Sequence, residues 1–400
     1  MSGDERSGAS PLRRVLDLLS GRQTRDRLAS LERLARKFGD AQRDGAGALQ
    51  ARLADIARAV TEQPTAKDLR ELRQALRGLA AQSDHRRLFD AVAQIGASDK
   101  PILIGPWTGE VGFELLYWIP FVEWARTHGG WARAREVIVS RGGVASWYGA
   151  SGRYCDALTL VGPEEFRSAI GEERRKQRRP GAFDDRLVQG AVGALGLGDV
   201  DILHPSLMYR ALASYWNDES GFAQVDQLTR HRLLAPPPGE RPSVCPPEYV
   251  AVRFYFNECF PETPENRAFA GRVVSALAAR TSVVVLNPGF RMDEHSDWMP
   301  DRTGRVVTIA GEITPDRNLA VQSAVIAGAR AFVGTYGGYS YLAPLYGVPS
   351  VAFSSNPAFK LHHLYAAPRV YSQIGAAALT PIDTAQVPVV QLAIGSLVSA

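Results

Sequence analysis

Long apolar runs are missing from this chain of 400 residues. A membrane-spanning helix needs about 20 consecutive apolar residues, and the first residues, MSGDERSGASPLRR, lack the apolar core of a signal peptide. With 45% hydrophobic and 22% charged residues, the composition predicts a soluble globular protein of about two or three domains. We expect a cytoplasmic location, either free or peripheral to the inner face of the membrane.

Cysteine is scarce. The three cysteines, Cys155, Cys245 and Cys259, are an odd number and lack the spacing of metal ligands. This pattern argues against a disulfide framework and against a zinc site. We expect buried thiols.

Excess charge is small and lies in one part of the chain. The formal net charge is +4, and the first 100 residues hold 19 of the 46 Lys and Arg but only 14 of the 42 Asp and Glu. Because acidic residues are interleaved with the basic ones, the first interpretation is a solvated helical surface, and the second is a contact with an anionic membrane or a nucleic acid. We expect no nucleic-acid partner.

Residues 1–98 are predicted to be helical. Two narrow leucine-rich stripes recur at helical spacing, at 49, 53, 56 and 60 and at 69, 72, 76 and 79, with Pro64 between them. They predict a helical hairpin or a short coiled coil. Its role is either homo-oligomerisation, partner docking or peripheral membrane contact, or that of a helical cap on the catalytic body, and the sequence leaves these alternatives open.

From residue 101 the pattern alternates between short apolar runs and longer amphipathic stretches, which indicates βα units around parallel sheets. The Pro-rich stretch 236–247 suits neither a helix nor a central strand. We therefore predict an α/β fold with two Rossmann-like domains facing a cleft: an acceptor-side domain at 99–235, the linker at 236–247 and a nucleotide-sugar domain at 248–400. The predicted strands are 102–105, 137–140, 158–161, 201–203, 249–256, 283–286, 306–309, 331–333 and 350–353.

The segment 331–355 predicts a strand, a glycine turn, a helix and a second strand. Gly337 and Gly338 leave backbone N–H groups unobstructed at a helix N-terminus, where a phosphate is favoured. Thr335 and Ser340 add hydroxyl donors. Tyr336, with its neighbours Tyr339 and Tyr341, can stack on a base or sugar or pack in the core. An ordinary βα turn is the alternative for the glycines.

A second candidate loop, GPWTGEVGFE, follows the first predicted strand of the first domain. Glu110 lies between Gly109 and Gly112, where a carboxylate can act as general base on an acceptor hydroxyl. Alternatively, the carboxylate stabilises a helix N-terminus. We favour the catalytic role for Glu110 and the helix-terminus role for Glu114.

The strand at 249–256 carries the third candidate. Arg253 is a cation in an otherwise apolar strand, and such a charge needs a partner. A diphosphate is one partner and a salt bridge to a buried carboxylate is the other. We favour the diphosphate, because Asn257 follows at the strand end.

Three weaker candidates receive simpler interpretations. The polar loop 291–298 has no metal-ligand spacing and is predicted to be a mobile loop at the cleft rather than a metal site. The basic run from Arg174 to Arg179 is interpreted as a solvated helix face. His362 and His363 are adjacent, so on a helix they diverge rather than share a site.

Together these motifs resemble GT-B glycosyltransferases, in particular bacterial lipopolysaccharide heptosyltransferases and fucosyltransferases. Gly338, Leu342, Ala343, Gly347 and Pro349 match the heptosyltransferase pattern, in which a Gly-rich turn precedes His-Leu-Ala and Gly-x-Pro. Tyr336 and Tyr341 stand where that pattern has an acidic residue and a histidine. Arg253 is similar to the arginine of the fucosyltransferase His-x-Arg strand, with Ala251 in place of the histidine.

The resemblance implies a metal-independent transferase without a cofactor, which moves a sugar from a nucleoside diphosphate sugar to a glycan or lipid-linked acceptor. In that mechanism Arg253 and the Gly337–Gly338 turn neutralise the departing diphosphate, and Glu110 takes the acceptor proton. Two alternatives stay open: a different GT-B enzyme such as a nucleotide-sugar epimerase, and a non-catalytic helical scaffold with a degenerate GT-B body.

Overall fold

The computed structural model describes residues 84–149, 153–173, 177–237, 239, 241–290, 295–300, 304–356, 361–386 and 395. The chain divides into two compact units, Met1–Phe89 and Asp90–Ala400, and the elements below belong to the second. Residues 84–97 are helical, as predicted. The two leucine-rich stripes lie outside the described residues, as do the predictions of oligomerisation and membrane contact that rest on them.

The first sheet has four parallel strands in the order β3-β2-β1-β4. They are β1 (Ile102–Ile104), β2 (Glu136–Ser140), β3 (Arg153–Asp156) and β4 (Asp201–Leu203). One continuous helical stretch follows β1, made of α5 (Val111–Phe113), the π-helical turn η1 (Glu114–Trp118) and α6 (Ile119–Gly129). The other helices are α7 (Ala157–Val161), α8 (Pro163–Glu173), α9 (Ala182–Ala194), α10 (Pro205–Ala211), α11 (Ala213–Trp216) and α12 (Ala223–Leu228).

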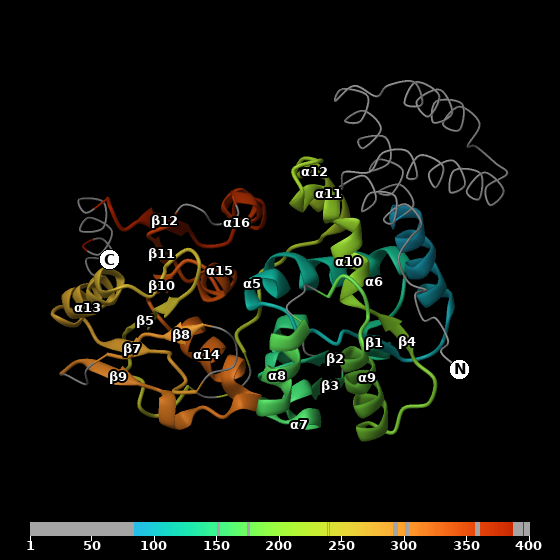
Figure 1. Ribbon diagram of the computed structural model, residues 1–400, viewed down its shortest axis with the longest axis horizontal. Coiled ribbons are helices and arrows are strands. Elements are labelled where there is room, and N and C mark those ends of the chain that lie inside the picture. Colours follow the sequence, from blue (N-terminus) through green and yellow to red (C-terminus); the bar gives the residue numbers. More distant parts are fainter. Residues whose placement is uncertain are drawn as a thin grey trace, which may run out of the picture. The chain divides into compact units, whose positions relative to one another are not determined.

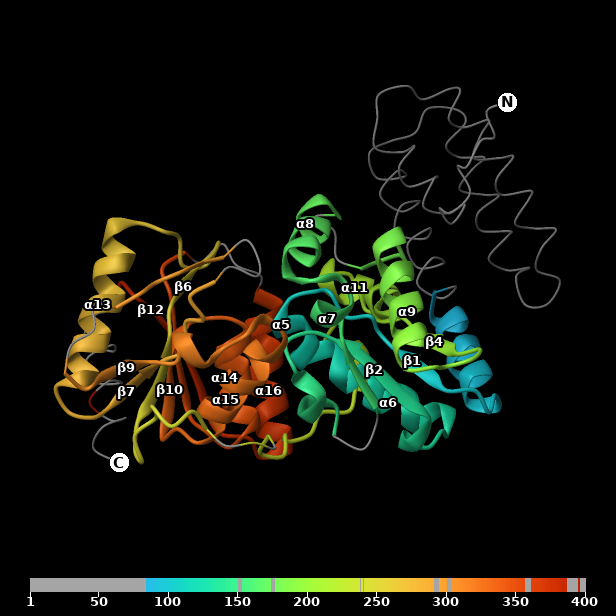
Figure 2. The ribbon, with the colours of Figure 1, turned by 90° about the horizontal axis from the view of Figure 1, so that it is seen from below.

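The strand order of this sheet decides which face each helix covers. From β1 to β3 the chain advances in one direction, and it then returns past β1 to form β4. Because crossovers between parallel strands are right-handed, this reversal places the helices before and after it on opposite faces. Figure 2 shows α6 and α9 on the two faces. The point of reversal lies between β1 and β4.

The second sheet has six parallel strands in the order β12-β11-β10-β5-β7-β9. They are β5 (Val250–Arg253), β7 (Val283–Val285), β9 (Val306–Thr308), β10 (Ala331–Thr335), β11 (Ser350–Ser354) and β12 (Leu379–Asp383). An antiparallel pair, β6 (Tyr255–Phe256) with β8 (Ser296–Asp297), lies beyond β5. The helices are α13 (Pro264–Ala278), α14 (Asn318–Ala327), α15 (Gly338–Leu345) and α16 (Leu361–Ile374).

The second sheet reverses between β5 and β10. The chain runs outward through β5, β7 and β9, then returns to β10 and runs outward again through β11 and β12. By the same handedness rule, α13 lies on one face and α14, α15 and α16 lie on the other. Figures 1 and 2 show this division. The predicted α/β fold with two parallel sheets is confirmed.

Three details of the predicted strands need correction. Residues 158–161 are not a strand: they belong to α7, because the Asp156 carboxylate caps this helix by accepting from Leu158 N at 2.9 Å. The predicted strand 249–256 is divided into β5 and β6. Three strands were not predicted: β3, β8 and the edge strand β12, which contains Pro381.

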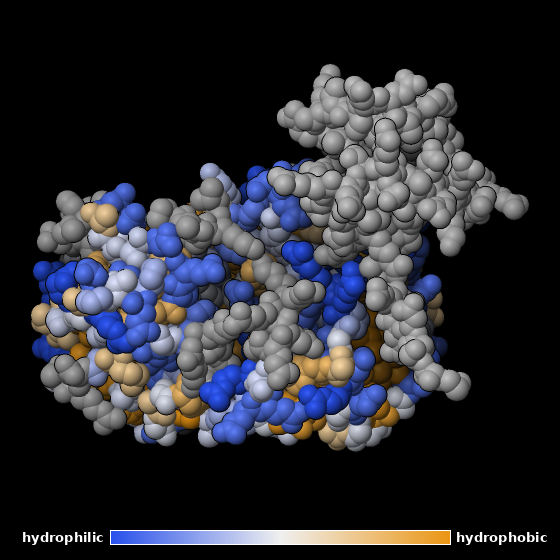
Figure 3. Space-filling model, viewed as in Figure 1, coloured by the Kyte–Doolittle hydropathy of each residue, from blue (hydrophilic) through white to orange (hydrophobic). Residues whose placement is uncertain are grey.

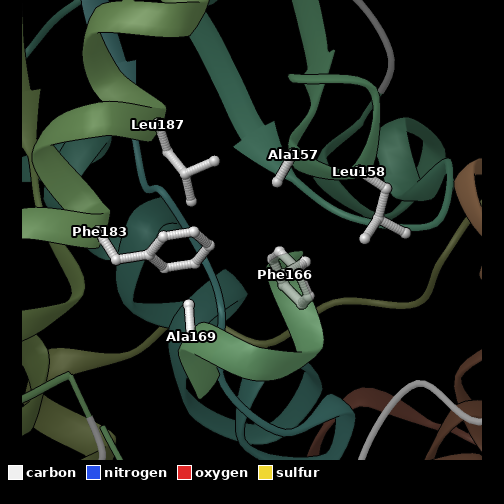
Figure 4. Packing of buried hydrophobic residues seen from close by; sticks show 6 residues of the cluster. All are labelled: Ala157, Leu158, Phe166, Ala169, Phe183 and Leu187. Atoms are coloured by element: carbon white, nitrogen blue, oxygen red, sulfur yellow. The ribbon is translucent and has the colours of Figure 1, made fainter. Parts of the chain in front are cut away.

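Apolar side chains of α7, α8 and α9 form a core beside the first sheet. Figure 4 shows Phe166 and Phe183 facing each other within this cluster, which also contains Ala157, Leu158, Ala169 and Leu187. The two phenyl rings meet edge to face, with centroids 5.8 Å apart. The contact packs the first turn of α8 against the first turn of α9.

The segment between the two sheets is bonded to both of them. Its first residues bind the helical stretch after β1: Arg230 N donates to Pro120 O (2.8 Å), His231 Nε2 lies 2.9 Å from Leu116 O, and Arg232 Nε donates to Glu123 Oε1 (3.0 Å). Two residues later, Leu234 N donates to Leu345 O of α15 at 2.9 Å. The chain therefore crosses from one sheet to the other within residues 232–234. The described residues of the Pro-rich stretch that follows form neither helix nor strand.

On the face in Figure 3, hydrophilic residues predominate and apolar residues occur in separate areas. The large hydrophobic side chains that are exposed come from different elements: Ile202, Leu233, Val244, Met299 and Tyr365. None of the described helices has both the length and the apolar character required to cross a bilayer.

Candidate functional site at the meeting point of the two sheets

The two points of strand reversal are brought together by α5 and α15. Ligands of open α/β sheets bind beyond the carboxyl ends of the strands at such points. The α5 helix follows β1, and α15 follows β10. A Cβ on Gly112 would lie 3.6 Å from the Cα of Gly338, and one on Gly338 would lie 3.0 Å from Gly112 N. The first turns of the two helices are therefore in direct contact, as Figures 1 and 2 show.

The segment 331–355 forms the predicted strand, glycine turn, helix and strand. Gly337 is required by packing, since a Cβ there would lie 1.9 Å from Tyr255 Oη. Ser340 closes the turn: its Oγ donates to Gly337 O (2.7 Å) and accepts from Gly337 N (3.0 Å). The N–H groups of the first helical turn have no intrahelical acceptor, and this turn of α15 is the one that contacts α5.

The other predicted residues of this segment are buried. Thr335 Oγ1 donates to Tyr255 O (2.7 Å) and accepts from Tyr255 N (3.0 Å), which ties β10 to β6. Tyr336 and Tyr341 pack edge to face, with centroids 5.4 Å apart. The alternative of core packing is thus observed for these two rings, and the Thr335 hydroxyl serves the sheet.

Arg253 lies at the end of β5, beside the first turn of α15. Its side chain stacks over the ring of Tyr339, with Cζ 4.1 Å from the centroid. Nη1 donates to Gln322 Oε1, and Nη2 donates to Asp297 Oδ1 at 3.2 Å. The salt bridge that the sequence left open is present. The guanidinium is held rigidly next to the helix N-terminus at the reversal point.

Asn257 has a local role. Its Oδ1 accepts from the backbone N of Cys259 at 3.0 Å and of Phe260 at 2.9 Å. This is a side-chain turn that shapes the chain after β6. The side-chain oxygen of Asn257, a candidate residue for the donor site, is therefore bonded within its own loop.

Glu110 is exposed at the N-cap position of α5, with extended backbone dihedrals and no side-chain capping bond. The loop before it is fixed by Arg141, whose Nη2 donates to Gly109 O. Both the catalytic role and the helix-terminus role remain compatible with this position. The carboxylate stands at the edge of the contact between α5 and α15.

Glu114 differs from its predicted role at a helix terminus. It is completely buried in η1, where it accepts from Ser140 Oγ (2.6 Å), Tyr148 Oη (2.7 Å) and Arg141 Nη1 (3.2 Å). Burial raises the pKa of Glu114, and the nearby Arg141 charge and the hydrogen bonds only partly offset this. Single π-helical turns are frequent at functional sites. Glu114 therefore positions Arg141, which donates a hydrogen bond to the Gly109 carbonyl.

The segment 177–179 also differs from the sequence interpretation, since it lies outside any helix. Gln177 is buried, and its side chain bonds the loop after β1: Nε2 donates to Pro106 O (2.8 Å) and Oε1 accepts from Thr108 N (3.0 Å). Sequence reasoning missed this residue. The one signal in the sequence was that Gln177 is the only uncharged residue in the basic run 174–179.

The remaining candidates bring no further group to the site. Residues 291–294 of the polar loop lie outside the described ranges, and within those ranges no three His, Cys, Asp or Glu side chains gather as a metal site. His362 pairs with Asp218 at 2.9 Å, whereas His363 Nδ1 lies 3.1 Å from Tyr117 Oη, so the two diverge as predicted. Cys155 and Cys259 are buried thiols, as expected, and Cys245 is partly buried.

Comparisons with known proteins give distant likenesses only. No protein-family model matches the sequence, and no curated protein matches it. Among solved structures, a glycosyl transferase family 9 protein from Veillonella parvula is similar over 74% of this chain and 90% of its own, with 13% identity and a TM-score of 0.37. The iron-containing dodecameric glycosyltransferase TibC from enterotoxigenic E. coli is similar over 64% of this chain, with 14% identity and a TM-score of 0.35.

A second TibC structure, described as a heptosyltransferase in complex with ADP-D-β-D-heptose, gives 12% identity and a TM-score of 0.35 over 64% of this chain. The aligned region spans 59% of the TibC chain in both cases. The function proposed below therefore rests on the geometry of this chain.

Proposed function

We propose that this protein is a glycosyltransferase that moves a sugar from a nucleoside diphosphate sugar to a hydroxyl group of a glycan or lipid-linked acceptor. The observation that carries the proposal is the contact between Gly112 and Gly338. It brings the reversal points of two parallel sheets to one place, where ligands of such sheets bind. A donor held by one sheet and an acceptor held by the other would meet there.

The donor diphosphate is assigned to the second sheet. The first turn of α15 presents backbone N–H groups and the positive end of the helix dipole. Arg253 adds a full positive charge beside that turn, since its guanidinium stacks on Tyr339 of α15. Negative charge grows on the diphosphate as the glycosidic bond breaks, so donors fixed in advance lower the barrier. Reaching the phosphate requires Arg253 to exchange part of its bonding to Asp297.

Glu110 is assigned as the general base. Its carboxylate is exposed beside the meeting point, and the Arg141 bond to Gly109 fixes the loop that carries it. A positioned carboxylate that accepts the acceptor proton contributes on the order of 100-fold or more to the rate.

Calorimetry of the full chain against UDP, GDP, ADP and dTDP sugars, with ADP-D-β-D-heptose among them, tests the donor assignment. We expect one nucleotide class to bind and Arg253→Gln to weaken its affinity by roughly 10-fold or more. Arg330→Gln is the matched control, since Arg330 lies on the same domain and pairs with Glu248 at 3.5 Å at the surface. No binding by any sugar nucleotide, or equal affinity in wild type and Arg253→Gln, would refute the assignment.

A further inference from the structure

The connection between α8 and α9 carries an unusual concentration of positive charge. The sequence from 174 to 179 is Arg-Arg-Lys-Gln-Arg-Arg. The structure describes its last three residues, and the packing of Phe166 against Phe183 fixes the helices on either side.

Gln177 attaches this connection to the loop that carries Glu110. Besides its bonds to Pro106 and Thr108, its Nε2 donates to Asp184 Oδ1 of α9 at 2.9 Å. The side chain is only 6% exposed. A buried amide with three bonds of this kind holds the neighbouring backbone firmly, so Arg178 starts directly beside residues 106–108.

Arg178 is available for a ligand. Its side chain is half-buried, and it has neither an ion pair nor a side-chain hydrogen bond to any residue that the structure describes. Arg186 on the nearby α9, by contrast, pairs with Glu165 of α8 at 2.7 Å. A half-buried guanidinium without a protein carboxylate is suited to bidentate binding of an external anion.

Tyr209 supplies a second polar group at the same place. It lies on α10, which follows β4, so it stands at the reversal point of the first sheet, and its ring stacks on Trp107. Burial raises the pKa of Tyr209, the Glu110 charge raises it further, and the charges of Arg178 and Arg141 lower it. The geometry agrees, because Trp107, on which Tyr209 stacks, lies between Pro106 and Thr108, the two residues that Gln177 binds. Its hydroxyl has no hydrogen-bond partner in the described part of the chain.

We propose that Arg178, with Tyr209 as a hydroxyl donor, binds a phosphate ester on the acceptor, next to the acceptor hydroxyl that Glu110 deprotonates. This deepens the proposed function and rests on it: the acceptor is a phosphorylated sugar or a glycan attached to phosphate, rather than a neutral one. Arg178, beside the first sheet, binds the acceptor phosphate, and Arg253, in the second sheet, binds the donor diphosphate. Two anions are thus kept apart by separate cations.

The test titrates glucose 6-phosphate and glucose, as charged and neutral probes, into the full chain with and without the nucleotide that binds best. We expect glucose 6-phosphate to bind and glucose to bind at least 10-fold more weakly. Arg178→Gln should lower the affinity for glucose 6-phosphate by roughly 10-fold, with Arg178→Lys between the two, because lysine keeps the charge but loses the planar fork. Nucleotide affinity should stay within about 2-fold of wild type.

Arg167→Gln is the control, because Arg167 is an exposed arginine on α8 and the substitution changes net charge equally. Equal binding of the two probes, or equal affinity in Arg178→Gln and Arg167→Gln, would overturn the proposal. So would a parallel loss of nucleotide affinity, which would move Arg178 to the donor site. Vesicles of phosphatidylglycerol form a further arm: Arg178-dependent binding to them without glucose 6-phosphate binding would assign the charge to a membrane surface instead.

The two proposals fail separately. If sugar nucleotides do not bind but glucose 6-phosphate binds through Arg178, the donor assignment is wrong and a phosphate site exists on the first sheet. If nucleotides bind and glucose 6-phosphate does not, the donor site stands and the acceptor phosphate is refuted.

Discussion

Gly112 and Gly338 face each other across the two sheets so closely that neither position has room for a side chain. A Cβ on Gly338 would lie 2.8 Å from the Cβ of Val111, and a Cβ on Gly112 would lie 3.0 Å from the ring of Tyr341. Such distances are well inside ordinary van der Waals contact. The glycines therefore do more than free backbone donors for a ligand: they set the distance between α5 and α15.

Replacing Gly338 with alanine should separate these two helices. The added methyl group overlaps Val111, so we expect the free energy of unfolding to fall by about 1–3 kcal/mol and nucleotide-dependent turnover to fall with it. Thermal or denaturant unfolding measures the first effect, and product formation measures the second. Gly193→Ala is the control: no atom lies within 4 Å of the added Cβ on α9, and removing a helical glycine should stabilise by roughly 0.5–1 kcal/mol. Equal behaviour of the two variants would show that the close contact has no energetic weight.

Replacing Glu110 with glutamine tests the general base. The amide keeps the size of the side chain but cannot accept the acceptor proton, so turnover should fall by about 100-fold or more while nucleotide affinity is unchanged. Calorimetry and initial-rate measurements on the same preparation separate the two effects. The control is Glu164→Gln on α8, which removes an exposed carboxylate elsewhere on the same domain. Unchanged turnover in Glu110→Gln would return this residue to the role of a helix-terminus carboxylate.

Glu114 should make the protein less stable as pH rises. Burial raises the pKa of Glu114 in the folded state, so ionisation is easier after unfolding. The stabilisation from the protonated form is complete below the unfolded pKa of 4.5 and is lost as pH rises through the folded value. Denaturant unfolding at a series of pH values should therefore show Glu114→Gln gaining stability relative to wild type as pH rises. A difference between the two proteins that is independent of pH would contradict this.

Glu123 should act with the opposite sign. Burial alone would raise the pKa of Glu123, but hydrogen bonds and charges from Arg126 and Arg133 outweigh it and lower the pKa from 4.5 to about 2. The stabilisation is present above pH 4.5 and is lost as pH falls through about 2. Glu123→Gln should therefore cost about 3 kcal/mol near neutral pH and progressively less on acidification.

The matched control for Glu123 is Glu165→Gln, which breaks a pair with Arg186 that is about half exposed. Exposed pairs contribute about 0–1 kcal/mol, so this variant should stay close to wild type across the pH range. The same pH series of denaturant unfolding measures both variants. Equal losses in the two would show that the partly buried arginines around Glu123 add nothing beyond a surface pair.

The fold was predictable where a short apolar run lies between polar or turn-forming residues. The strands at 102–104 and 283–285 are buried runs of β-branched and other apolar residues, and parallel sheets require such runs. Residues 158–161 are equally apolar, but a run of four cannot distinguish a strand from a helix by periodicity. The Asp156 cap decided the matter, and it was visible in the sequence. The strand β12 was hidden by Pro381, which an edge strand tolerates.

The candidate site was predictable in its loops and less so in its individual bonds. Sequence position placed Glu110 and Gly338 at strand ends, and that is sufficient for residues that act from a loop. It could not show that Thr335 hydrogen-bonds to the backbone of Tyr255, or that Asn257 hydrogen-bonds to the backbone of Cys259, because those bonds depend on the exact course of the backbone. Nor could it show that Glu114 is buried against Ser140, since helix periodicity does not predict a π-helical turn.

The segment that joins the sheets determines where they can pivot. Arg232 is bonded to the helices of the first sheet and Leu234 to α15 of the second, so Leu233 alone separates bonds to opposite sides. Its side chain is 44% exposed and so puts little packing in the way of a change in its backbone dihedrals. A swing that separates α5 from α15 would combine a torsion at Leu233 with the loss of bonds between the sheets, such as Trp147 Nε1 to Ser323 Oγ (3.0 Å) and Ala320 N to Gly142 O (2.8 Å). The proline-rich stretch after Leu233 would move together with the second sheet.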